Sequence, residues 1–232
     1  MNSERLAVIP ARAGSKRFPG KNTARLGEKP LILYTVEAVM SSNSFDRIIV
    51  STDDSIVVNI VKSVSGIEIH HRPPHLSTNT VTTIKVLIHI LKENCITNGI
   101  CGIFLPTCPL RTGEHISEAM EQLTKDVDSV VGVAYYAVPP SFSAELIMGS
   151  NPPILKFPHN SPLLQGRTRV QLQPTMVYPN GAIYLAWTDR LLVNKSFFKG
   201  RVSGYLMDRI SSVDIDEEID LKFAEAVLRV RR

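Results

Sequence analysis

Short apolar runs alternate with amphipathic stretches over the first 130 residues or so of the chain. The runs are rich in Val and Ile, which is typical of buried strands, and they lie at 6–11, 47–51, 67–71, 100–105 and 129–133. Apolar residues recur with helical spacing between them, at 31–40, 56–64, 81–91 and 116–125. This alternation predicts an α/β fold, with a Rossmann-like, mainly parallel sheet and helices on both faces. Ligands of such folds bind beyond the carboxyl ends of the strands.

The alternation stops near residue 138. Eight of the 15 prolines lie between Pro139 and Pro179, in a stretch with few charges. Apolar residues such as Leu146, Ile154 and Leu164 give this stretch surface to bury. We therefore expect residues 138–179 to be a dimerisation insert rather than a linker, and the protein to be a homodimer.

Regular patterns return after the insert, with strands expected at 182–186 and 202–206 and a helix at 217–230. Leu221, Ala224 and Leu228 share one face of that helix. Residues 1–137 are thus expected to form the nucleotide-binding part of the α/β domain, and residues 180–232 to complete it.

The net charge of +4 hides an uneven distribution, because residues 1–30 carry seven basic and only two acidic side chains. No interleaved aromatic residues accompany this basic end, so a small phosphorylated ligand is expected and a nucleic acid is not. No stretch approaches the length of a membrane span, and the opening apolar run is too short for a signal peptide, which predicts a cytoplasmic protein without a membrane partner. The three cysteines lack metal or disulfide spacing, and the histidines show no ligand spacing, so no metal is assigned to either.

The loop after the first strand, 12–22, has the composition of a phosphate-binding loop. It contains two glycines and four cations: Gly14, Gly20, Arg12, Lys16, Arg17 and Lys21. Glycines let backbone N–H groups approach phosphate oxygens, and the cations can neutralise a triphosphate. It is not a Walker A loop, because five residues separate the glycines and Asn22 stands where that motif has Ser or Thr.

Asp214 and Asp216 lie two residues apart in a segment expected to be extended, so both carboxylates point to the same side. Such a pair suits Mg²⁺, which binds through one or two carboxylates together with substrate phosphates. Asp216 could equally cap the following helix, and the residues alone leave both interpretations open. For Asp53 and Asp54, at the end of a strand, helix capping is the simpler explanation for at least one of them.

The segment IPARAGSKRFPGKN resembles the opening of CMP-sialic acid synthetases, the acylneuraminate cytidylyltransferases. Further matches follow in the order and spacing of that family: IVSTDD at 49–54, RPPHLS at 72–77, FLPTCPLR at 104–111, NGAIY at 180–184 and VDID at 213–216. The resemblance implies a fold of the nucleotide-diphospho-sugar transferase type. It also implies the reaction of CTP with a sialic-acid-type nonulosonic acid to give a CMP-sugar and pyrophosphate, with Mg²⁺ held by Asp214 and Asp216.

Several roles follow from the resemblance together with the charged loop. The predicted catalytic residues are Arg12, Lys21, Asp214 and Asp216. The predicted CTP-binding residues are Arg12, Ser15, Lys16, Lys21, Asn22, Arg72 and Thr83. The predicted sugar-binding residues are Leu105, Thr107, Arg169, Tyr184, Phe197 and Phe198.

The chain departs from the family pattern on the sugar side. Leu105 replaces a Gln, Cys108 replaces a Ser, and Val170 stands where an Arg is expected. Either Arg169 or Arg167 then holds the sugar carboxylate, or that carboxylate is held elsewhere. An N-acylneuraminate is the expected substrate. These departures keep legionaminic, pseudaminic and 3-deoxy-manno-octulosonic acids open. A nucleotide-binding regulator without catalysis is a further alternative, against which the intact charged residues argue.

Overall fold

The computed structural model describes residues 3–15 and 17–230 and divides the chain into two compact units. One unit combines Met1–Val133 with Pro179–Arg232, and the other is Ala134–Tyr178. The sequence predicts an insert at residues 138–179, so the second unit begins four residues earlier and ends one residue earlier than expected. Each unit is described by itself below.

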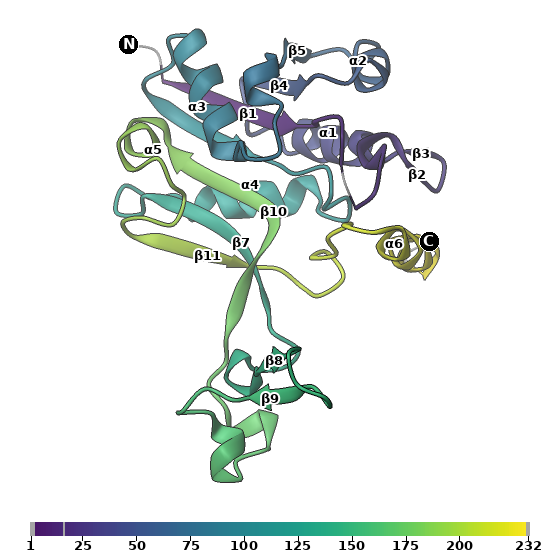
Figure 1. Ribbon diagram of the computed structural model, residues 1–232. Helices are drawn as coiled ribbons and strands as arrows, with labels where there is room; N and C mark the ends of the chain where they lie inside the picture. The colour runs from purple at the N-terminus through teal and green to yellow at the C-terminus, as the bar shows by residue number, and fades with distance from the viewer. Residues whose placement is uncertain (1–2, 16, 231–232) are drawn as a thin grey trace. The chain divides into compact units, whose positions relative to one another are not determined.

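The first unit is built on a seven-stranded sheet with the order β11-β7-β10-β6-β1-β4-β5 (Figure 1). Its strands are β1 (Glu4–Pro10), β4 (Arg47–Thr52), β5 (Ile67–His71), β6 (Gly99–Ile103), β7 (Ser129–Tyr135), β10 (Val177–Trp187) and β11 (Val202–Leu206). Parallel pairs join β5 to β4, β4 to β1, β1 to β6 and β11 to β7, whereas β10 runs antiparallel to β6. The predicted mainly parallel sheet is confirmed.

Helices cover both faces because alternate residues of the central strand point to opposite sides. In β1, Ala7 and Ile9 pack with α1 (Leu31–Ser41), α2 (Ser55–Val61) and α4 (Gly113–Glu121). Leu6 and Val8 pack instead with α3 (Thr83–Glu93) and α5 (Thr188–Asn194). The helices on both faces are as predicted, except that α5 was not expected.

The closing helix α6 (Glu218–Val230) packs outside the sheet. Ala224 is fully buried, and Leu221 and Leu228 pack against the same cluster, as their helical spacing predicted. That cluster also contains Leu26, from the small hairpin of β2 (Arg25–Leu26) and β3 (Lys29–Pro30), and Ile215 from the segment before the helix. The helix therefore holds the acidic segment close to the hairpin that follows the first loop.

The second unit contains a short antiparallel pair, β8 (Glu145–Ile147) and β9 (Ile154–Lys156), and little other regular structure. Single 3-10 turns, η3 (Pro140–Phe142), η4 (Pro162–Gln165) and η5 (Val170–Leu172), account for part of the rest. The proline-rich sequence explains this, since proline removes backbone donors and interrupts helices and central strands. The unit exposes large apolar side chains: Leu146, Met148, Ile154, Leu155, Leu164 and Leu172.

Within the residues that the structure describes, no helix is both long and apolar enough to cross a membrane.

Candidate active site

The first loop is anchored to the carboxyl ends of β1 and β4. The backbone N–H of Ala13 donates to the Asp53 carboxylate at 2.8 Å, and the Asn22 amide donates to the Arg12 carbonyl at 3.0 Å. Gly20, with φ 70°, turns the chain into η1 (Lys21–Thr23) in a conformation that glycine adopts without a steric penalty. Asp54 caps α2 by accepting from the Ile56 N–H at 2.8 Å, as predicted for one of the two aspartates.

A cavity of about 260 Å³ opens beside this loop, beyond the ends of β1 and β5. It is lined by Pro10, Arg12, Ser15, Lys21, Asn22, Arg72, Val81, Thr83 and Val86. The structure thus brings together all the predicted CTP-binding residues that it describes, while Lys16 lies outside the described residues. These residues come from three separate parts of the sequence, and their meeting at the carboxyl edge of the sheet matches the usual position of ligands in such folds.

Arg72 contributes a buried cation to the cavity, with only 7% of its surface exposed. Its Nε donates to the Ser51 hydroxyl at 3.1 Å and its Nη2 donates to the Ser51 carbonyl at 2.8 Å, which fixes the guanidinium. Burial lowers the pKa of Arg72 from its usual value, and the nearby Asp53 partly opposes that change. An arginine remains charged in a protein, so this edge of the cavity favours an anionic or carbonyl oxygen.

The acidic segment near the C-terminus reaches the first loop. Lys21 Nζ lies 3.1 Å from one Asp216 oxygen, and Arg17 Nη2 lies 2.9 Å from the other. A backbone hydrogen bond holds the acidic segment in place: the Ile215 N–H donates to the Thr107 carbonyl at 2.8 Å. The structure thereby joins two motifs that are 195 residues apart.

Asp220, rather than Asp216, has the capping role at the start of α6. One oxygen of its carboxylate accepts from the backbone N–H groups of Asp216 and Glu217, at 2.9 and 2.8 Å. The carboxylate of Asp216 is instead held by the two cations of the first loop. The capping interpretation of Asp216 is therefore wrong for its side chain.

Asp214 and Asp216 flank Ile215, whose side chain is fully buried. Desolvation by surrounding protein atoms raises the pKa of Asp214, although its side chain remains open to solvent on one side. The charge of Asp216 also raises that pKa, whereas Thr107 and Lys21 lower it. Two neighbouring carboxylates with hard oxygen donors fit a divalent cation such as Mg²⁺.

A second cavity, of about 250 Å³, lies next to the first and shares Thr83 with it. Its walls are mostly apolar and aromatic: Thr82, Thr83, Ile84, Ile103, Leu105, Tyr184, Lys195, Ser196, Phe197 and Phe198. The Tyr184 ring packs against those of Phe197 and Phe198, with centroids 5.4 and 6.2 Å apart. Four predicted sugar-binding residues, Leu105, Tyr184, Phe197 and Phe198, therefore line one pocket.

Two predicted sugar-binding residues lie elsewhere, and several lining residues were missed, among them Lys195 and Ser196. Thr107 does not line the second cavity but supports the acidic segment, and Arg169 lies in the second unit, where its role stays a prediction. Lys195 and Ser196 follow α5, a helix that the sequence pattern did not predict. Lys195 adopts a left-handed backbone conformation, with φ 50°, at the end of that helix. Their only sequence signal was adjacency to the aromatic pair.

Cys108 is a buried structural thiol. Its Sγ donates to the Asn180 carbonyl at 3.3 Å and lies 3.7 Å from an Asp214 oxygen. Burial raises the pKa of this thiol to about 12, so it stays protonated and unreactive at neutral pH. The sequence argument against a cysteine nucleophile agrees with this environment.

Comparison with known proteins agrees with this arrangement. Residues 6–138 match the family model described as cytidylyltransferase, which is more than half of the chain. The chain belongs to the cytidylyltransferase family.

Two relatives within this family match most of the chain. The chain is 34% identical over 226 residues to an N-acylneuraminate cytidylyltransferase of Streptococcus agalactiae serotype V, with 93% of this chain and 51% of the relative covered. It is 32% identical over 232 residues to a CMP-N,N'-diacetyllegionaminic acid synthase of Legionella pneumophila, with 98% and 97% covered. The chain thus spans about half the length of the streptococcal member of the family and nearly all of the legionella member.

The fold of this cytidylyltransferase also matches a solved structure. A CMP:2-keto-3-deoxy-manno-octonic acid synthetase in complex with CTP superposes with a TM-score of 0.68, covering 99% of this chain and 100% of that one. The two sequences are 16% identical, so the likeness concerns the fold.

Proposed function

We propose that the protein transfers a cytidylyl group from CTP to a nonulosonic acid, with an N-acylneuraminate as the first candidate substrate. The observation that carries the proposal is the meeting of the phosphate loop, Arg72 and the acidic pair beside one cavity. The N-acylneuraminate and legionaminic acid names of the two relatives support the same reaction class.

In the proposed reaction, the anomeric hydroxyl oxygen of the sugar attacks the α-phosphorus of CTP. The bond from that phosphorus to the bridging oxygen breaks, pyrophosphate leaves, and the hydroxyl proton passes to solvent. Arg12 and Lys21 lie where they can neutralise the triphosphate as charge moves onto the leaving group. Their contribution is positioning and charge neutralisation, without a covalent intermediate.

We propose Asp214 and Asp216 as the residues that would hold Mg²⁺. The ion, when bound, would supply neutralisation of phosphate charge. The chain prepares the site in two ways: the Ile215–Thr107 hydrogen bond fixes the acidic segment, and Lys21 lies between Asp216 and the nucleotide cavity. Because Lys21 lines that cavity and contacts Asp216, it is suited to move between the carboxylate and a phosphate oxygen.

The second cavity supports a particular alternative for the sugar. Leu105 replaces the Gln expected in sialic acid synthetases, and with Ile84 and Ile103 it forms an aliphatic part of the wall. That part suits acyl groups better than hydroxyl groups, because aliphatic side chains offer no partner for a buried hydroxyl. A diacetylated legionaminic acid is therefore the second candidate substrate. Lys195 supplies a cation in that wall which could contact the sugar carboxylate.

A pyrophosphate-release assay tests the reaction and both substrates. CTP, UTP and ATP are each combined with N-acetylneuraminic, N,N'-diacetyllegionaminic, pseudaminic and 3-deoxy-manno-octulosonic acids. We expect turnover with CTP and one of the first two sugars only. Equal rates with UTP or ATP would refute the nucleotide assignment, and pyrophosphate release without any sugar acid would refute the transfer reaction.

A further inference from the structure

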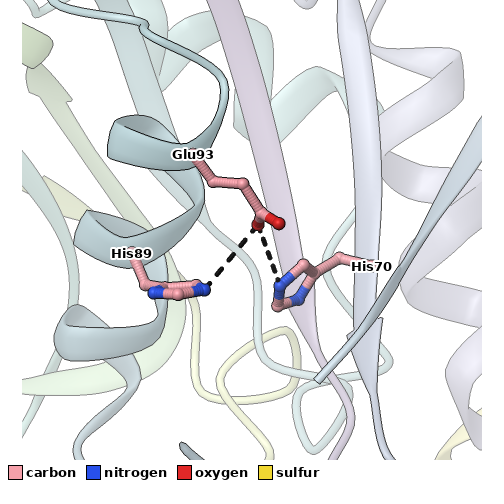
Figure 2. A group of neighbouring side chains, drawn as sticks. All are labelled: His70, His89 and Glu93. Atoms are coloured by element: carbon pink, nitrogen blue, oxygen red, sulfur yellow. Dashed lines mark ion pairs between the residues drawn. The ribbon is translucent and has the colours of Figure 1, made fainter. Parts of the chain in front are cut away.

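Three ionisable side chains meet between β5 and α3, outside the residues considered above. Figure 2 shows the Glu93 carboxylate between the imidazole rings of His70 and His89. Its Oε2 lies 3.4 Å from His70 Nε2 and 3.7 Å from His89 Nε2, and the three ligand atoms all lie within 4.8 Å of one another. His89 and Glu93 are one helical turn apart on α3, and His70 faces them from β5.

We propose that His70, His89 and Glu93 form a binding site for a zinc-class divalent metal ion that links β5 to α3. Two imidazoles and one carboxylate, with a further position open to water, are a ligand set that proteins use for Zn²⁺. Imidazole also favours Zn²⁺, Cu²⁺ and Ni²⁺ over Mg²⁺ and Ca²⁺, so the expected occupant differs from the ion proposed at Asp214 and Asp216.

The distances are close to those that a metal ion requires. Tetrahedral Zn²⁺ with bonds of about 2.0–2.1 Å places its ligand atoms about 3.3–3.4 Å apart. The His70–Glu93 separation of 3.4 Å already matches, and the His89–Glu93 separation of 3.7 Å is slightly longer. The two histidine nitrogens lie within 4.8 Å of each other, so they would have to approach as the ion binds. The Glu93 side chain is 55% exposed and that of His89 is 34% exposed, which leaves an approach from solvent.

A hydrogen bond outside the ligand set orients His70. Its Nδ1 lies 2.9 Å from the Ser51 hydroxyl, which directs Nε2 toward Glu93. The Ser51 oxygen already accepts from Arg72 Nε, and a hydroxyl oxygen has a second lone pair that can accept from His70 Nδ1–H. Metal-binding histidines commonly have such a partner on their second nitrogen.

A contact with a fourth side chain agrees with the site. His75 packs edge-on against His89 with centroids 5.8 Å apart, which restricts the rotation of that ring. The histidine spacing in the sequence concealed the site because its ligands come from different elements.

The site has a structural consequence that does not depend on the reaction proposed above. β5 is the edge strand of the sheet, and Arg72 follows its last residue. An ion bound by His70 and by two residues of α3 would fix that edge strand against the helix. The Ser51 hydroxyl would connect this site to the nucleotide cavity, because it contacts both His70 Nδ1 and Arg72 Nε.

Calorimetric titration of Zn²⁺ into the metal-stripped chain, prepared without a histidine tag, tests the proposal. We expect one Zn²⁺ per chain and a higher melting temperature at saturation, because binding to the folded state stabilises it. His89→Ala and Glu93→Gln should each weaken binding by roughly tenfold or more. His159→Ala is the control: His159 is exposed and lies in the second unit, so its replacement should leave Zn²⁺ binding unchanged.

Thermal melts of the metal-free variants separate a lost ligand from a lost fold, and Glu93→Gln keeps the size of the side chain. Binding that is equally tight in His89→Ala, Glu93→Gln and the unmodified chain would overturn the proposal. So would binding that is lost in Cys95→Ser but kept in His89→Ala, because the exposed thiol would then be the ligand. Equilibrium binding is measured without nucleotide or sugar, so failure here and failure of the proposed reaction are distinguishable.

Discussion

Asp216 lies between two cations of the first loop, and its replacement tests the metal role proposed for it. Asp216→Asn keeps the shape of the side chain but removes the charge. We expect turnover to fall by roughly 100-fold or more, since a metal ion contributes several kcal/mol of transition-state stabilisation. The melting temperature should change little, because partly exposed ion pairs contribute at most about 1 kcal/mol.

Turnover measured across a Mg²⁺ titration, beside a thermal melt, checks this expectation. Glu217→Gln is the matched control, since it removes the same charge from the neighbouring exposed residue. Near-normal activity of Asp216→Asn at low Mg²⁺ would mean that the metal is held elsewhere.

Single site residues could be predicted from the sequence where one continuous loop carries most of the binding groups. Glycine and cation placement identified the first loop, and the described members of the predicted nucleotide set line one cavity. Lys195 and the pairing of His70 with His89 were not predictable in this way. Each depends on contacts between elements far apart in the sequence, which residue spacing does not record.

At the scale of elements, the edge strand β5 is held to β4 by a bidentate ion pair. Arg47 Nε and Nη2 each donate to one oxygen of Glu68 at 2.7 Å, and this pairing lowers the pKa of Glu68. A carboxyl group with a lowered pKa stabilises the folded state above its unfolded pKa and loses that contribution as pH falls through its folded pKa.

Glu68→Gln should therefore lower the free energy of unfolding at pH 7, by up to about 1 kcal/mol because both groups are partly exposed. The difference from the unmodified chain should vanish below the lowered pKa of Glu68, where the pair is no longer charged. Urea denaturation at pH 7 and at a series of pH values falling below 4.5, the ordinary pKa of this side chain, measures both. Glu121→Gln is the control, since Glu121 makes no ion pair within residues 3–15 and 17–230. A loss that stays the same down to the lowest pH at which the protein is folded would show that the ion pair is not the cause.

Elements with a strong apolar period were predicted well, and those shaped by tertiary contacts were not. The predicted strand 67–71 matches β5, and the predicted strand 202–206 matches β11. The antiparallel direction of β10 had no signal in the apolar pattern, because alternation of strands and helices says nothing about a strand that enters from an insert. Helix α5 is short and buries few residues, which leaves little periodicity to detect.

At the scale of the whole molecule, the second unit leaves several large apolar side chains exposed to solvent. The exposed fraction is 74% for Leu172 and 60% for Leu164. Where such side chains form one patch, they mark a protein interface. Its sequence predicted a dimerisation insert, and that role remains a prediction.

We expect the chain, of 25.7 kDa, to scatter light as a dimer at assay concentrations. Leu172→Asp and Leu164→Asp should each shift the mass toward that of a monomer, since a charge buried without a partner opposes association. Val193→Asp is the matched control: Val193 is 81% exposed on α5, in the other unit, and its replacement should leave the dimer intact. Circular dichroism of each variant checks that the fold is kept. A fully active monomer of the unmodified chain would refute the dimer, and dissociation by Val193→Asp alone would move the interface to the first unit.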